Sequence, residues 1–188
     1  MKKFSLPMII VIIMTFGFTQ KSNAQKQSKG LYLTDNDYAN HKLSYTGDAI
    51  SIHEFLGGGN VTVISNGQKQ EFEKSKIFGY KDDDGKDYRF YDNRSYQIVD
   101  ATEFFLYSYD KLIQQGKGPK PTKVYYFSKN SGTEVLALTP ENIAIAFPDN
   151  AKFRYLVEVA YKSAMNLDAY DNLTHQYEIK EMYTASLK

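Results

Sequence analysis

The chain has 188 residues, of which 42% are hydrophobic and 24% charged, and its formal net charge is +1. This composition is typical of a globular protein and excludes collagen-like and low-complexity chains. The near-neutral charge does not indicate a nucleic-acid partner, because such binding depends on neutralising phosphates. Cysteine is absent, which excludes disulfides, thiolate nucleophiles, Cys-ligated metals and the lipid-modified cysteine that anchors bacterial lipoproteins.

The first 24 residues have the three parts of a secretory signal peptide. Lys2 and Lys3 form a basic start, an apolar stretch covers 6–18, and Ser22-Asn23-Ala24 supplies small residues before a cleavage point. The apolar stretch is 13 residues long, whereas a membrane span needs about 20. We therefore expect cleavage after residue 24 and not a retained anchor. Cleavage removes three lysines and no acid, which changes the formal charge from +1 to −2.

Residues 25–30 are polar and are expected to form a disordered lead-in. Between 31 and 138 the pattern has a period of two residues and predicts about eight short strands in an antiparallel meander, either an open sheet, a sandwich or a partial barrel. Asn66-Gly67 predicts a hairpin, because both positions of its turn need positive φ. A second hairpin is expected around the acidic turn at 82–85.

Three further segments complete the predicted β-rich part. Asp92-Asn93 predicts another turn, and strands are expected at 96–99 and 104–109. Glycines and prolines then predict a basic loop before the strand at 124–127. The loop contains Lys111, Lys117, Lys120 and Lys123. These lysines are expected to be solvated, because single surface charges interact weakly.

The periodicity changes at Thr139-Pro140-Glu141, which has the capping hydroxyl, the proline and the acid of a helix start. Pro148 ends this helix, and a second helix begins after Asn150 or Asp149. Its apolar stripe is formed by Phe153, Leu156, Val157, Ala160, Tyr161 and Ala164. Residues 167–185 are predicted to be helical, with a strand at 177–179 as the alternative. The predicted fold is a single α+β domain over 31–188, with helices from 139–188 packed on the sheet.

The metal and phosphate motifs are incomplete. His53-Glu54 begins an HExxH zinc motif, but position 57 is Gly and not His. The histidines His41, His53 and His175 are far apart in sequence, which does not predict a shared metal site. Glycines 57–59 lack the Lys-Ser/Thr and the following helix of a phosphate-binding loop. We therefore predict no metal ion and no cofactor.

The remaining catalytic patterns are equally incomplete. The acidic turn at 82–87 does not fit the EF-hand register, because Tyr80 and Tyr91 occupy positions that need carboxylates. Ser128 and Ser163 lack a nucleophile-elbow motif. Hydrolysis by a pair of carboxylates remains an alternative, since a sequence does not show the distance between two carboxylates in space. No catalytic residue is assigned.

Three segments resemble a family of small uncharacterised exported proteins from Bacteroidetes-type bacteria. They are 22–25 at the end of the signal peptide, 79–91 from Gly79-Tyr80-Lys81-Asp82 to Tyr88-Arg89-Phe90-Tyr91, and 139–150 from Thr139-Pro140-Glu141-Asn142 to Phe147-Pro148-Asp149-Asn150. The resemblance covers most of the mature chain. It implies export but no known activity, so it assigns no functional residue.

Two functions follow as hypotheses. The favoured one is a non-catalytic secreted or periplasmic module that binds an unknown ligand or protein partner, with the 16 tyrosines supplying sheet surface. The alternative is a small hydrolase that uses carboxylates on sugars or envelope polymers. A cleft lined by two carboxylates and tyrosines would favour the hydrolase, whereas a flat or filled sheet face would favour the module.

Overall fold

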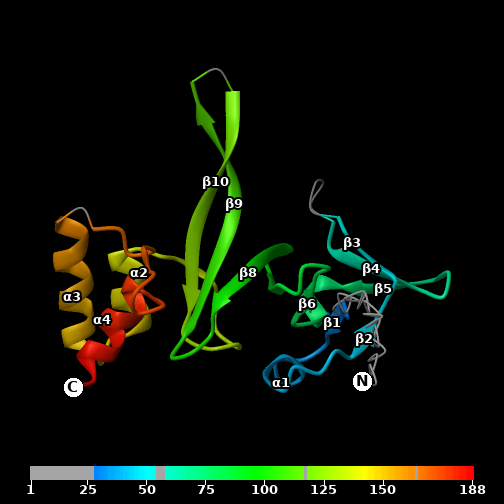
Figure 1. Cartoon of the computed structure of the whole chain (residues 1–188), viewed down its shortest axis with the longest axis horizontal. Coiled ribbons are helices and arrows are strands. Elements are labelled where there is room, and N and C mark those ends of the chain that lie inside the picture. Colours follow the sequence, from blue (N-terminus) through cyan, green and yellow to red (C-terminus); the bar gives the residue numbers. More distant parts are fainter. Residues whose placement is uncertain (1–27, 54–57, 117, 164) are drawn as a thin grey trace, which may run out of the picture.

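The computed structural model describes residues 28–53, 58–116, 118–163 and 165–188. The predicted signal peptide at 1–24 lies outside the described residues. The main element is an eight-stranded antiparallel sheet in the order β11-β10-β9-β8-β7-β6-β1-β2 (Figure 1). Its strands are β1 (Gly30–Tyr32), β2 (Tyr45–Thr46), β6 (Gly79–Lys81), β7 (Asp87–Tyr91), β8 (Arg94–Asp100), β9 (Phe105–Gln115), β10 (Gly118–Ser128) and β11 (Leu136–Ala137). Because β6 to β11 are neighbours in sequence order, the antiparallel meander is confirmed.

Three strands that were predicted within the meander form a separate sheet. β3 (Ala49–Ile52), β4 (Asn60–Ser65) and β5 (Gln68–Glu73) pair in sequence order. The predicted hairpin between β4 and β5 is confirmed, with φ of 51° at Asn66 and 76° at Gly67. Val61 and Val63 of β4 are buried against the main sheet. These strands therefore contribute to the core through side-chain packing and not through backbone pairing with the meander.

The edge of the main sheet beside this small sheet was not predicted. β1 begins at Gly30, inside the expected lead-in, and pairs with both β2 and β6. The short helix α1 (Asp35–Ala39) follows β1. Thr34 and Asp37 form its capping box, in which each side chain accepts a hydrogen bond from the other residue's backbone. A short 3-10 turn, η1 (Lys74–Lys76), leads from β5 to the second hairpin.

The basic loop predicted between 111 and 123 is wrong, because most of it continues β9 and β10. Each of these strands has 11 residues, and they pair from Phe105 opposite Ser128 to Gln115 opposite Gly118. The far half, residues 110–116 and 118–123, projects from the body of the protein and is called the arm below (Figure 1). Glycine and proline in this segment favour a loop when they are considered from the sequence alone. Proline is tolerated where its nitrogen faces no partner strand, as on an edge.

The C-terminal part is helical and packs on the main sheet, as predicted. It comprises α2 (Pro140–Ala146), α3 (Ala151–Lys162) and α4 (Glu178–Ser186). The helix predicted over 167–185 is wrong before residue 178, because the chain turns at His175, which has a φ of 56°, and forms the small hairpin β12 (Tyr170–Asp171) and β13 (Gln176–Tyr177). Thr139 caps α2 and Asn150 caps α3. Phe153, Val157 and Ala160 of the predicted stripe are buried and Leu156 is partly buried. Tyr161 is instead 59% exposed, because the buried stripe is narrower than predicted; residue 164 lies outside the described residues.

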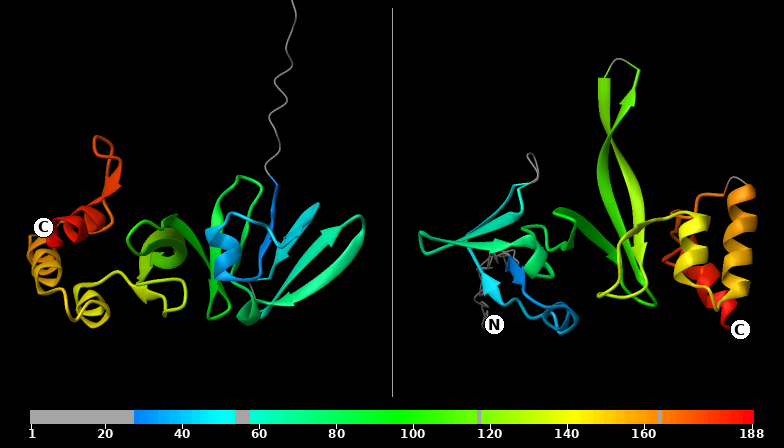
Figure 2. Two further views of the ribbon diagram at one scale, coloured as in Figure 1. Left: turned by 90° about the horizontal axis from the view of Figure 1, so that it is seen from below. Right: turned by 180° about the vertical axis from the view of Figure 1, so that it is seen from behind.

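The helices and the small sheet cover opposite ends of one face of the main sheet, which we call the front face. Residues directly opposite on neighbouring strands share a face. The row that defines the front face is Leu31, Tyr80, Tyr88, Gln97, Ser108 and Tyr125. The helices pack on Leu106 and Phe127 of this face, and β3–β5 pack on Leu31 and Tyr80. Figure 2 shows the two units at the two ends with the sheet between them, and neither the described helices nor β3–β5 pack on the middle of the front face.

The opposite face, called the back face, is filled by aromatic side chains around a buried guanidinium. Arg89 is 5% exposed and donates hydrogen bonds to the Tyr107 hydroxyl (2.9 Å), the Ser128 hydroxyl (2.9 Å) and the Thr133 carbonyl (2.8 Å). Tyr96, Tyr107 and Val135 form the small core there. This part of the back face is closed by its own packing, so the open part of the sheet lies on the front face.

Candidate functional site

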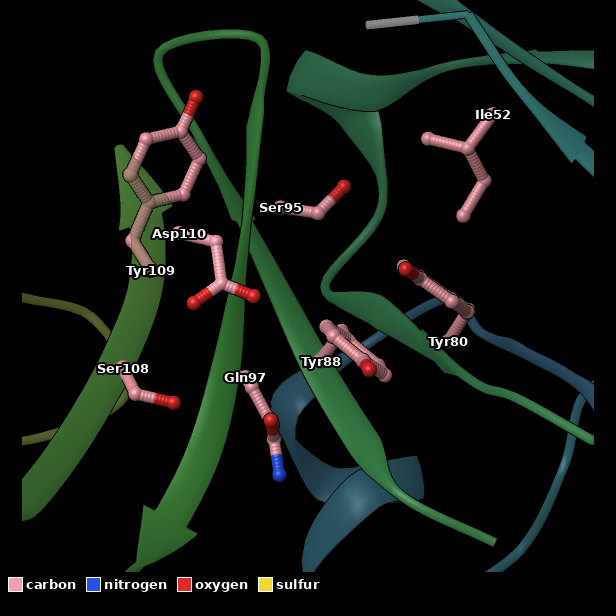
Figure 3. Close-up of a pocket in the computed structure, with 8 residues that line it drawn as sticks. All are labelled: Ile52, Tyr80, Tyr88, Ser95, Gln97, Ser108, Tyr109 and Asp110. Carbon is pink, nitrogen blue, oxygen red and sulfur yellow. The ribbon is translucent and has the colours of Figure 1, made fainter. Parts of the chain in front are cut away.

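An open groove occupies the uncovered middle of the front face. Its volume is about 430 Å³, which lies within the usual range for ligand sites. Four strands of the main sheet and the end of β3 contribute to it. The lining residues are Ile52, Tyr80, Tyr88, Ser95, Gln97, Ser108, Tyr109 and Asp110 (Figure 3).

Strand pairing brings the groove residues together from distant parts of the sequence. Tyr80, Tyr88, Gln97 and Ser108 lie opposite one another on β6, β7, β8 and β9. The rings of Tyr80 and Tyr88 are stacked, with centroids 4.6 Å apart and an interplanar angle of 5°. Figure 3 shows this pair across the groove from Ser108 and Asp110. The groove therefore has one aromatic wall and one wall of hydrogen-bonding groups.

The groove lies where β9 separates from β8. The pairing of β8 with β9 ends at Gln97 and Ser108, although β8 begins earlier, at Arg94. β9 continues past Ser108 into the arm, which brings Asp110 to the rim of the groove. Because the two strands diverge, the N-terminal half of β8 and the arm leave a gap between them, and this gap is the groove.

Tyr88 of the aromatic wall is uncharged at physiological pH. Burial raises the pKa of the Tyr88 hydroxyl above its ordinary value of 10.0, and the nearby carboxylate of Asp82 raises it further. The hydroxyl of Tyr88 therefore keeps its proton, which it donates to the Asp82 carboxylate, and its oxygen is left to accept a hydrogen bond. Asp110 is exposed at the opposite rim and supplies the one carboxylate among the lining residues.

This arrangement is suited to binding by hydrogen bonds and aromatic contact. Hydroxyl and amide groups in the groove can pair with a polar ligand or a peptide backbone, and tyrosine rings offer flat apolar surface. Hydrolysis of a glycosidic bond uses two carboxyl groups on either side of that bond. The lining residues include Asp110 and no second acid, so the groove supplies half of that machinery.

The three histidines remain apart. His41 follows α1, His53 follows β3, and His175 lies in the turn between β12 and β13. Among the residues that the structure describes, no group of three or more His, Asp or Glu side chains is placed to hold a metal ion. The incomplete zinc motif that begins at His53 continues into 54–57, which lie outside the described residues.

The carboxylates of the acidic turn at 82–87 are all paired with backbone N–H groups or with lysines. The Asp82 carboxylate accepts hydrogen bonds from the backbone N–H groups of Asp84 and Lys86 (both 2.9 Å). Lysines pair with the other carboxylates at 2.7 to 3.1 Å: Lys29 with Asp83, Lys86 with Asp84, and Lys81 with Asp87. Gly85 has a φ of 78°. The segment is a hairpin turn, and it acts on the groove through Asp82 and Asp84, which both raise the pKa of Tyr88.

The two serines are not arranged as nucleophiles. The Ser128 hydroxyl contacts Tyr107 and Arg89 in the back-face core and donates a hydrogen bond to the Asn130 carbonyl (2.8 Å). The Ser163 hydroxyl donates to the carbonyl of Val159 (2.9 Å). Neither hydroxyl has a histidine or carboxylate as a hydrogen-bond partner among the described residues, so both serines serve the fold.

A second hollow, of about 570 Å³, lies between the outer sides of α2 and α3. Its lining includes the exposed ion pair of Glu158 and Lys162 (2.6 Å), one turn apart on α3. Such pairs are common on helix surfaces and contribute little. The groove on the front face is the better candidate, because several strands converge on it.

The comparisons with known proteins add no assignment to this geometry. A scan against protein-family models, a search of curated proteins and a search of solved structures each found no match to the chain. Within the described part of the chain, no helix has the length and apolar character needed to cross a membrane. The sequence did not point to the groove, because its residues come from separate strands and form no motif.

Proposed function

We propose that this protein is an exported, non-catalytic binding module whose ligand occupies the groove on the front face. The observation that carries the proposal is the aromatic and polar lining of an open groove between two packed units. Export is supported by the predicted signal peptide at 1–24 and by the resemblance to exported proteins. The absence of cysteine agrees with both export and cytoplasmic residence and is neutral on this point.

The non-catalytic part of the proposal is supported by the chemistry of the lining. Asp110 is exposed at the rim, whereas a catalytic acid of a glycosidase is usually held in an apolar setting that raises its pKa. Tyr88 is kept protonated by burial and by Asp82, so its hydroxyl is not ionised at neutral pH and does not supply a general base. The groove thus offers groups that can bind a ligand but no side chain whose pKa is adjusted for acid or base catalysis.

The test combines binding and turnover measurements. The probes are neutral oligosaccharides and short extended peptides, titrated calorimetrically into the purified mature protein. A groove-filling variant, Gln97→Trp, should lose binding, while Tyr155→Trp, at an exposed position of α3, should retain it. Mass spectrometry of each bound probe should show no product. Turnover that is lost in Asp110→Asn would overturn the proposal in favour of a hydrolase, and the absence of binding by every probe would overturn the groove as the site.

A further inference from the structure

The arm has two edges that differ in their ability to pair with another strand. The backbone N–H of Leu138 donates to the Tyr125 carbonyl (3.0 Å), so the polar groups of Tyr125 point toward β11 and away from β9. Backbone orientation alternates along a strand. Pro119, Pro121 and Lys123 therefore also point outward from β10. The two prolines have no N–H, and the outer edge of β10 is poor in donors.

The other edge of the arm, formed by β9, keeps all of its backbone N–H and C=O groups. Residues opposite these prolines are Gln114 and Leu112, and Asp110 lies opposite Lys123. Their backbone groups point away from β10, toward the side on which β8 pairs with β9 nearer the body of the sheet. The β8 ladder ends at Ser108, and no other strand within the described residues pairs with β9 beyond that point. An incoming extended segment would find a full row of donors and acceptors there.

The side chains along this edge alternate in character between the two faces. On the back face, Lys111 and Ile113 lie opposite Thr122 and Lys120, and both lysines are exposed. On the front face, Leu112 is 63% exposed and lies opposite Pro121, with the exposed polar residues Asp110 and Gln114 on either side of it along β9. A strand added to this edge would place one residue beside Lys111 on the back face and the next beside Leu112 on the front face.

Charge distinguishes a foreign segment from a second copy of this chain. Between residues 111 and 133 the sequence contains five lysines and no acidic residue. Among the described residues of the arm, Lys111, Lys120 and Lys123 carry positive charge. Two arms pairing edge to edge would bring the lysines of the two copies closer, and like charges opposite one another destabilise a sheet. An acidic segment would instead be attracted by the arm. The edge also begins at Asp110, so a bound strand would lead directly into the groove.

We infer that the free edge of β9 binds an extended protein segment in which acidic and apolar residues alternate, as an added strand of the main sheet. The inference rests on the proposed function and names its partner class. Backbone hydrogen bonds from the 110–114 row would supply affinity, and the lysines and Leu112 would supply selectivity. The remainder of the segment would enter the groove beside Ser108.

The probe is a labelled synthetic peptide in which glutamate and valine alternate, and the matched control peptide alternates lysine and valine. Fluorescence anisotropy with the mature protein should show saturable binding of the glutamate peptide alone, weakened by added salt. Lys111→Glu should reduce its affinity by about tenfold or more, while Lys152→Glu, at an exposed position of α3, should leave it unchanged.

The backbone contribution is tested with a matched pair at one position. Leu112→Pro removes an outward N–H and should abolish binding, whereas Leu112→Ala keeps that N–H, removes only the side-chain contact and should weaken binding without abolishing it. Gln114→Pro repeats the test at the next outward position, and thermal melts verify that each variant is folded. Equal binding of the two peptides, full binding by folded Leu112→Pro and Gln114→Pro variants, or self-association of the protein through the arm would overturn the inference. If oligosaccharides occupy the groove while the glutamate peptide does not bind, this inference fails and the proposed function stands.

Discussion

The ammonium of Lys180 lies 2.9 Å from the carboxylate of Asp100 and joins α4 to the end of β8. Lys180 is 2% exposed and also donates to the Phe104 carbonyl. Its ammonium lies 3.9 Å from the centre of the Phe104 ring, and Glu103 supplies a second carboxylate at 3.6 Å. Burial lowers the pKa of Lys180, and the two carboxylates reduce that shift. The helices are thus held to the sheet by a desolvated ion pair as well as by apolar packing.

We predict that Asp100→Ala lowers the free energy of unfolding by about 3 kcal/mol, because it leaves the buried Lys180 with a more distant counter-ion. Chemical denaturation of the purified variant measures this loss. The exposed pair of Glu158 and Lys162 provides the control, and Lys162→Ala should cost less than about 1 kcal/mol. Equal effects of the two substitutions would show that the Lys180 pair does not contribute more than a surface pair.

The same carboxylate predicts a dependence of stability on pH. Burial raises the pKa of Asp100, but hydrogen bonds from Thr102 and Lys180 outweigh this effect and hold it below its ordinary value of 3.8. A carboxyl whose pKa is lower in the folded state stabilises the fold above its unfolded pKa and loses that contribution as pH falls through the folded pKa. The stability difference between wild type and Asp100→Asn should therefore shrink below pH 3.8. A difference that stays constant down to full protonation would contradict it.

A substitution at Gly67, in the turn between β4 and β5, should change stability through the backbone conformation and not through side-chain packing. Gly67 has a φ of 76°, and no atom lies within 4 Å of the position that its Cβ would occupy. Gly67→Val should lower stability by about 1–2 kcal/mol, because a β-branched residue resists positive φ. Gly118 is equally open but does not have a positive φ, so Gly118→Val should leave the melting midpoint nearly unchanged.

The buried stripe of α3 predicts that the helices are part of the cooperative core. Phe153 is fully buried, and Phe153→Ala should cost about 3–5 kcal/mol. Leu156 is partly buried, so Leu156→Ala should cost less, about 2 kcal/mol. Tyr155 is 65% exposed on the same helix, and Tyr155→Ala should stay within about 0.5 kcal/mol. A Phe153→Ala protein with a normal melt would show that the helices do not share the unfolding transition of the sheet.

The predicted export gives a prediction that does not depend on the fold. Expression of the full chain in a Gram-negative host should yield a mature protein that begins at Gln25, because Ser22-Asn23-Ala24 supplies the small residues before the cleavage point. Intact-mass measurement of the exported fraction tests it. Uncleaved protein in the membrane fraction would contradict the predicted cleavage.

The sequence by itself determined the elements that depend on local chemistry. Asn66-Gly67 determines a hairpin because its turn needs positive φ at both positions, and Thr139-Pro140 determines a helix start because a hydroxyl and a proline satisfy the first turn. The spacing of Phe153, Val157 and Ala160 determines the buried side of α3. Each of these signals lies within a few residues of the turn or helix that it specifies. They can therefore be recognised without knowing which other elements pack against that segment.

Only the tertiary structure decided which elements meet. β3–β5 pack as a second layer because Val61 and Val63 find apolar partners on the front face, and an alternating pattern does not say which sheet a strand joins. Pro119 and Pro121 fit β10 because no strand of the described residues pairs with its outer side there. The groove arises where β9 diverges from β8, which brings together side chains from five strands. No local sequence pattern predicts that these side chains lie together, because their positions depend on the register of all the strands that form the groove.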